Sequence, residues 1–190
     1  MGGRTMSTTR RSGSSQPCLV RISSTTYRLA SDQAANATTV AAVGKRLGLA
    51  DHAVTIALAA ALQESGLHNV GHGDRDSLGL FQQRPSQGWG TPAAILTPRL
   101  AAARFYERLA MVAGWRTLSV SAAAQRVQRS AAPNAYADWE LEARDLAQAM
   151  TGESAAGLAC QYTSATRGLR RPVVDQAAAE SSAPRASAPW

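Results

Sequence analysis

The sequence contains no long run of apolar residues. No segment approaches the ~20 consecutive apolar residues of a membrane-spanning helix, so we expect no integral membrane segment. Residues 1–30 also lack the apolar stretch of about 7–15 residues that a secretory signal needs. Polar residues follow the pair Arg10-Arg11, where a twin-arginine signal would continue with apolar ones. These absences argue against an integral membrane protein and show no route of export.

Acidic residues are scarce, with 13 Asp+Glu against 20 Lys+Arg and a formal charge of +7. Such an excess is typical of proteins that bind nucleic acid or an anionic surface. Its distribution argues otherwise, because residues 1–30 carry +5 while residues 31–152 and 153–190 carry +1 each. We therefore expect no nucleic-acid partner. Residues 1–30 are interpreted as a basic, low-complexity arm with strand-like residues at 19–22 and 25–29 that can form a short hairpin.

The length of 190 residues permits one core of about 100–150 residues with tails, and not two well-cored domains. Hydrophobic residues make up 45% but aromatic residues only 5%, which favours an alanine-rich helical domain. Helical periodicity covers residues 31–152, which we take as the domain. Residues 153–190 form a C-terminal extension. Beyond about residue 163 they are Ala, Ser, Pro and Arg with few large apolar residues, so we expect disorder there.

Apolar spacing predicts five helices, at residues 32–47, 52–65, 98–113, 121–129 and 135–150. The second has little polar surface on any side, so we expect a buried, central helix with Asp51 as its cap and Gly66 at its end. Residues 67–97 connect the second and third helices. A connection of this length far exceeds the usual 4–6 or so residues, which predicts a functional loop.

Glu64 is the one acid in the body of the central helix and lies in its last turn. On a helical wheel it sits at the shoulder of the apolar stripe, half-buried where the long loop begins. Such surroundings disfavour the charged form of a carboxyl group, as a general acid requires. The alternative is a surface glutamate near a helix end, although the helix dipole disfavours an anion there. Both interpretations stay open on these grounds.

The long loop is rich in glycine and carries the amides Gln82, Gln83 and Gln87 together with an exposed-looking Trp89. Amides bind hydroxyl and acetamido groups, and an aromatic face stacks on a sugar ring. With one carboxylic acid nearby, these groups are typical of a glycan cleft. A structural interpretation also stands, in which the glycines shape a β-hairpin and the apolar residues of the loop pack.

The order of Glu64-Ser65-Gly66, Gly73-Asp74-Arg75 and Gly79-Leu80-Phe81-Gln82 resembles the goose-type lysozyme and soluble lytic transglycosylase families. Those families share a glutamate and serine at the end of a buried helix, followed by a GLMQ-like strand. The specific match spans about residues 53–90. It implies an α+β, predominantly α-helical, lysozyme-like fold with a small β-hairpin beside the cleft. It also implies cleavage of the β-1,4 bond between N-acetylmuramic acid and N-acetylglucosamine in peptidoglycan.

The resemblance assigns roles to individual residues. Glu64 matches the catalytic general acid, and Asp74 matches a loop aspartate that helps to place water. Gln82 matches the glutamine that contacts the acetamido sugar, and Tyr136 the tyrosine that approaches the glutamate. The substrate-binding candidates as a set are Ser65, Asp76, Gln82, Gln83, Trp89, Gln128 and Tyr136.

One departure affects the reaction. Goose-type enzymes have an aspartate two residues after the glutamine, where this chain has Arg84. A second carboxylate would then come from Asp74 or Asp76, which are equally well explained as turn residues. Lytic transglycosylases need no second carboxylate, because one glutamate acts as acid and then as base toward the sugar's 6-hydroxyl, giving a 1,6-anhydro product. Hydrolysis and anhydro formation both remain open.

Potential metal ligands occur at His68, His72, Asp74 and Asp76. No CxxC or HExxH frame accompanies them, so we assign no metal and no cofactor. Two other functions compete with an enzyme: a non-catalytic module that binds cell-wall glycan and, less favoured, a metal-binding protein.

Cys18 precedes the helical domain and Cys160 follows its last helix, the placement of a staple between both ends of one core. Two cysteines permit one pairing and prove none, so a disulfide and two free thiols both stay open. A disulfide would indicate an oxidising compartment. With the inferred substrate it predicts an extracytoplasmic monomer whose partner is peptidoglycan. Either the start of the chain is then incomplete or export uses another system.

Overall fold

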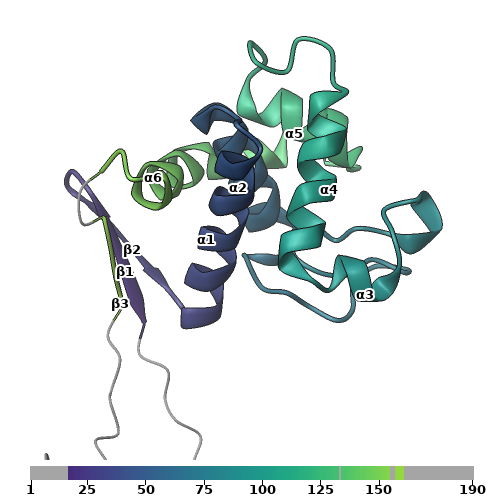
Figure 1. Ribbon diagram of the computed structural model, residues 1–190, viewed down its shortest axis with the longest axis horizontal. Coiled ribbons are helices and arrows are strands. Elements are labelled where there is room, and N and C mark those ends of the chain that lie inside the picture. Colours follow the sequence, from purple (N-terminus) through teal and green to yellow (C-terminus); the bar gives the residue numbers. More distant parts are fainter. Residues whose placement is uncertain (1–16, 133, 155–156, 161–190) are drawn as a thin grey trace, which may run out of the picture.

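The computed structural model describes residues 17–132, 134–154 and 157–160 (Figure 1). The disorder expected beyond residue 163 lies outside these residues, as does most of the arm. The fold is α+β and predominantly helical, as the sequence predicted. Its elements, with η for 3₁₀ helices, are β1 (Cys18–Ile22), β2 (Thr25–Leu29), α1 (Ser31–Arg46), α2 (Asp51–Ser65), η1 (Pro85–Gln87), α3 (Pro92–Ile95), α4 (Pro98–Ala110), α5 (Val120–Gln128), η2 (Ala135–Trp139), α6 (Glu140–Thr151) and β3 (Leu158–Cys160).

Helix α2 runs through the centre of the molecule, as predicted, with α1, α4, α5 and α6 packed around it (Figure 1). Every residue from Ala53 to Leu62 is buried. The alanines in this stretch let the neighbouring helices approach closely on all sides. The predicted cap is wrong, because Ala50 occupies the N-cap and Asp51 begins the helix, with its carboxylate 2.8 Å from Lys45 Nζ. Gly66 ends α2 at φ 59°, as predicted.

The five predicted helices are all present. The last begins as the 3₁₀ helix η2 before continuing as α6, and on α6 the predicted pair Glu140–Arg144 forms at 2.6 Å. Within the long connection, η1 and α3 were not predicted. Each is three or four residues long, too short to leave a periodic signal, and each begins at a proline that presets its backbone.

The three strands form an antiparallel sheet in the order β2-β1-β3. Strands β1 and β2 make the hairpin expected at residues 19–29, whereas β3 was not predicted. Cys18 and Cys160 pair across β1 and β3 and form a disulfide, which confirms the staple between residues 142 positions apart. The sheet lies beside α6, on the opposite side of the molecule from the long connection (Figure 1).

The β-hairpin expected beside the cleft is reduced to one bridge. Within the described residues 66–97, the single bridge Leu78–Gln83 takes its place. The chain turns too tightly for two strands, because Gly79 and Gln82 adopt φ values of 74° and 46°. A side chain at Gly79 would lie 2.7 Å from the Ile95 carbonyl oxygen, so glycine is needed there.

The apolar residues of this turn enter the core. Leu80 and Phe81 are fully buried, and the Phe81 ring stacks on Phe105 of α4 with a centroid distance of 4.8 Å. This packing anchors the polar residues of the turn to the helical body. None of the helices in the described part of the chain is long and apolar enough to cross a membrane.

Candidate active site

The end of α2 is held in place by α1, which fixes the position of Glu64. The Gln33 side-chain amide donates a 2.8 Å hydrogen bond to the Gly66 carbonyl, and the Asn36 amide donates one of the same length to the Leu67 carbonyl. These bonds use carbonyls left free where the helix ends. Glu64 is half-buried there and lines a pocket.

Tyr136 of η2 orients the Glu64 side chain. Its hydroxyl donates a 2.7 Å hydrogen bond to Glu64 Oε1, and the tyrosine is fully buried. Burial, and then the hydrogen bond to Glu64, raises the pKa of Tyr136 well above its ordinary value, so the phenol stays protonated and acts as a donor. The structure thus brings together two residues, 72 positions apart, that the family resemblance had paired.

Two side chains hold the turn that contains Gln82. Ser65 Oγ donates to the Leu80 carbonyl at 2.8 Å, and Gln128 Nε2 of α5 donates to the Phe81 carbonyl at 2.8 Å. Ser65 therefore binds backbone and is absent from the pocket lining, whereas Gln128 contributes to that lining. The turn is fixed between the end of α2 and the end of α5.

Three residues that line the pocket have left-handed backbones although they are not glycine. These are Arg75, Gln82 and Arg129, with φ values of 55°, 46° and 54°. Each such residue costs about 1–3 kcal/mol, and this kind of strain concentrates at functional sites. The Gln82 side chain lies against Gly73, where any side chain would collide with Gln82 Oε1.

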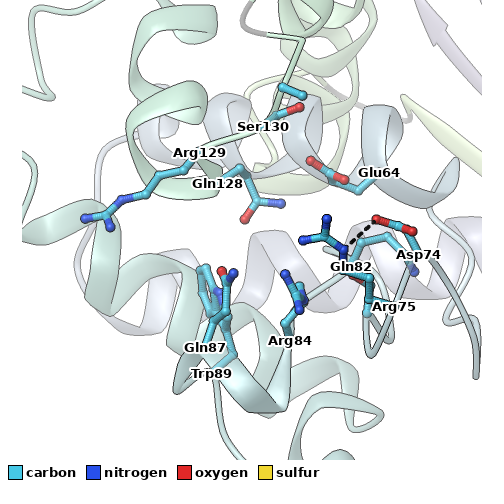
Figure 2. A pocket seen from close by; sticks show the side chains of 12 residues that line it. Glu64, Asp74, Arg75, Gln82, Arg84, Gln87, Trp89, Gln128, Arg129 and Ser130 are labelled. Carbon is cyan, nitrogen blue, oxygen red and sulfur yellow. Dashed lines mark ion pairs between the residues drawn. The ribbon is translucent and has the colours of Figure 1, made fainter.

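The pocket has a volume of about 490 Å³. In Figure 2, Glu64, Asp74 and Arg75 lie at one end, and Arg129 and Trp89 lie toward the other. The lining residues are Glu64, Asp74, Arg75, Ser77, Gln82, Arg84, Gln87, Trp89, Gln128, Arg129, Ser130 and Ala131. It is thus a polar groove with one half-buried carboxyl group, three arginines and three amides.

Trp89 is not the exposed ring that the sequence suggested. Only 5% of the residue is exposed, and the Arg108 guanidinium lies over the ring at 3.7 Å from its centroid. Arg108 also donates to the Gln87 and Gly88 carbonyls, which folds this part of the loop against α4. Trp89 still contributes to the pocket wall, but most of its surface packs inward.

Gln83 lies in the core and not in the pocket, so its assignment to substrate binding is wrong. The residue is 1% exposed, and its amide nitrogen donates to the Ala101 carbonyl of α4 at 3.1 Å. The left-handed backbone of Gln82 turns the two neighbouring glutamines to different sides. Of these two neighbours, Gln82 reaches the pocket and Gln83 does not.

The two loop aspartates differ in environment. The Asp74 side chain is 93% exposed at the rim of the pocket, 3.9 Å from Arg75 Nε. Asp76 is absent from the lining and accepts hydrogen bonds from Ser86 N at 2.8 Å and Arg84 Nε at 2.6 Å. These bonds from Ser86, and then Arg84, hold the pKa of Asp76 well below its usual range. Asp76 therefore positions Arg84, which does line the pocket.

The histidines of the loop do not gather with the aspartates. His68 Nδ1 lies 2.7 Å from Asp32 Oδ2 of α1. Across the part of the chain that the structure describes, no three His, Cys, Asp or Glu side chains converge on a metal-sized site.

Sequence reasoning missed the arginines of the pocket. Arg75 entered only within the Gly73-Asp74-Arg75 motif and Arg84 only as a departure from a family pattern. Arg129 and Ser130 were not considered as site residues. Both follow Gln128 at the end of α5, where Arg129 takes the left-handed conformation. That conformation favours glycine, so an arginine carries no recognisable signal for it.

A comparison with models of protein families finds no match for this chain, and no curated protein matches it at a significant level.

Proposed function

We propose that the protein cleaves the β-1,4 bond between N-acetylmuramic acid and N-acetylglucosamine in peptidoglycan, with Glu64 as general acid. The hydrogen bond from Tyr136 to Glu64, at one end of an amide-lined pocket, carries the proposal. A half-buried carboxyl group with a fixed orientation can protonate the glycosidic oxygen as the C1–O bond breaks. The sequence resemblance to goose-type lysozymes and lytic transglycosylases, and with it a lysozyme-like fold, supports the same reaction.

The amides of the pocket suit the proposed substrate. Gln82, Gln87 and Gln128 present side-chain amides along the groove, and amides can both donate to and accept from acetamido and hydroxyl groups. Gln128 already uses its nitrogen on the Phe81 carbonyl, so its oxygen is the group that faces a sugar. Asn/Gln donors and acceptors of this kind recognise neutral glycan without requiring a metal.

We further propose that the product is a 1,6-anhydro sugar. After protonating the leaving oxygen, the Glu64 carboxylate accepts the proton of the 6-hydroxyl as O6 forms its bond to C1. Hydrolysis would instead need a second carboxylate to hold water, but Asp76 is engaged by Arg84 and Ser86. Asp74, which does line the pocket, is 93% exposed at the rim.

The disulfide supports an extracytoplasmic location for this activity. A bond between Cys18 and Cys160 persists in oxidising compartments, which is also where peptidoglycan is found. We propose that the protein acts there as a monomer on glycan strands.

The proposal is tested by comparing wild type with Glu64→Gln on purified peptidoglycan. We expect Glu64→Gln to lower muropeptide release by about 10²–10⁴-fold while binding to insoluble peptidoglycan is retained. Glu140→Gln is the matched control, because Glu140 pairs with Arg144 on α6 and does not line the pocket. Its activity should equal that of wild type. Binding without release by wild type would indicate a glycan-binding module and overturn the enzymatic proposal.

A further inference from the structure

A second groove of about 370 Å³ opens where the end of α4 meets α5. Its lining combines three arginines with three apolar residues: Arg108, Met111, Val112, Arg126, Val127 and Arg129. Met111 is 75% exposed, so its apolar surface is available to a ligand in the groove. The groove is thus both cationic and apolar.

Within the described ranges, the arginines of this groove lack acidic partners. Among the residues that the structure describes, no carboxylate forms an ion pair with Arg108, Arg126 or Arg129. Burial, and then the charges of Arg129 and Arg104, lowers the pKa of Arg108 from its ordinary value. Like charges that repel one another in this way are stabilised by a bound anion.

The second groove adjoins the pocket of Glu64. Arg129 lines both, and in Figure 2 its side chain extends away from Glu64. Arg108 lines the second groove and also covers Trp89, which belongs to the wall of the first. A ligand that extends from Glu64 past Gln128 therefore reaches Arg129 and the edge of the second groove.

We propose that this groove binds the carboxylate groups of the peptide stems attached to the glycan strand, so that the enzyme prefers peptide-bearing over peptide-free glycan. The inference rests on the proposed function, which supplies the glycan in the first pocket. Guanidinium groups bind carboxylates through paired, charge-assisted hydrogen bonds. The apolar side chains of Met111, Val112 and Val127 suit the methyl and methylene groups of a short peptide.

The test measures binding in the Glu64→Gln background to three ligands: glycan with intact stems, glycan with amidated stem carboxylates, and glycan freed of stems by an amidase. We expect intact stems to bind most tightly. Arg126→Gln, which lines only the second groove, should lower that preference by about threefold to tenfold and leave binding to stem-free glycan unchanged. Arg144→Gln is the matched control, since Arg144 pairs with Glu140 on α6 and lies outside both grooves.

Equal binding of intact and amidated stems, or an equal loss on all three ligands in Arg126→Gln, would overturn the inference. Tighter Arg126-dependent binding of a phosphodiester polymer than of stem-bearing glycan would overturn it as well. Failure of the proposed function looks different. If wild type discriminates between the ligands through Arg126 but releases no muropeptides, the inference about the groove stands and the proposed enzymatic activity is wrong. If wild type cleaves intact and stem-free glycan equally well, the proposed enzymatic activity stands and the inference about the groove is wrong.

Discussion

At the scale of single residues, the site depends on how one carboxyl group is held. Glu64 stands in the last turn of α2, and Gln33 and Asn36 bind the carbonyls of the two residues that follow this helix. Glu64 Oε1 accepts a hydrogen bond from Tyr136. Position and orientation are therefore fixed by separate contacts. Tyr136 acts on Glu64 and not on the substrate in this account, so it is a positioning residue.

Tyr136→Phe removes the 2.7 Å hydrogen bond to Glu64 and leaves the ring in place. We expect kcat to fall by about tenfold to a hundredfold, because a small displacement of a catalytic group has an effect of this size. The free energy of unfolding should fall by about 1 kcal/mol. Steady-state kinetics and urea unfolding measure the two effects.

Tyr106→Phe is the matched control for this substitution. Tyr106 is also buried, and its hydroxyl donates a 3.0 Å hydrogen bond to the Val40 carbonyl; neither residue lines the pocket. A similar loss of stability with unchanged kcat is expected. Equal kcat values for the two variants would refute the positioning role of Tyr136.

The positions of the site residues could be predicted from the sequence where the local sequence pattern determines them. Glu64 at the end of a buried helix follows from apolar spacing and the stop at Gly66. The positions of Gln82 in the pocket and Gln83 in the core could not be predicted in this way. They depend on a left-handed backbone at Gln82, a residue type that rarely adopts one. Trp89 became buried because Arg108, from another element, covers it.

At the scale of elements, the long connection between α2 and α4 keeps its shape through polar contacts as well as through Leu80 and Phe81. Asp76 accepts from Ser86 N at the start of η1 and from Arg84 Nε, which ties two parts of the loop together. The same contacts set the position of Arg84 in the pocket. Loop shape and pocket charge are thus coupled through one carboxylate.

Asp76→Asn should weaken this tie in a pH-dependent way. The pKa of Asp76 is lowered in the folded protein, so its stabilisation is complete well above the unfolded value of about 3.9 and is lost as the pH falls below it. We expect wild type to be more stable than Asp76→Asn at pH 7 and the difference to narrow from about pH 4 downward. Urea unfolding of both proteins across this range provides the measurement.

Asp74→Asn serves as the control, since Asp74 is 93% exposed and its only ion pair is a long one of 3.9 Å to Arg75 within the described residues. Its stability should follow that of wild type at every pH. A stability difference between wild type and Asp76→Asn that stays constant down to pH 3 would contradict the assigned role.

At this scale the sequence predicts long elements better than short ones. The five main helices each contain more than two turns of apolar spacing, and strand β1 of the hairpin alternates between buried and more exposed residues. Strand β3 has three residues and no pattern of its own, and it forms because Cys160 pairs with Cys18 in the sheet. Pairing with the distant strand β1 therefore stabilises β3, whose own sequence does not predict a strand.

At the scale of the whole molecule, the disulfide joins strand β1, which precedes the helices in the chain, to strand β3, which follows them. It closes a loop of 142 positions and lies in the sheet beside α6, on the side away from the long connection (Figure 1). The bond therefore stabilises the fold without taking part in the site.

Cys18→Ala/Cys160→Ala should lower the free energy of unfolding by about 4–5 kcal/mol in the loop-entropy model, because the unfolded chain is no longer constrained. Urea unfolding of the variant, of oxidised wild type and of reduced wild type measures this. Reduced wild type should resemble the variant. A difference below about 1 kcal/mol between oxidised and reduced wild type would contradict this account of the bond.

The most direct test of the central claim is the chemical structure of the new glycan ends that wild type produces from purified peptidoglycan. Mass spectrometry of the released muropeptides should show 1,6-anhydro ends, which are lighter by one water than reducing ends. Glu64→Gln should produce neither kind. Release of muropeptides at the same rate by Glu64→Gln, or reducing ends alone from wild type, would contradict a mechanism in which Glu64 is both acid and base.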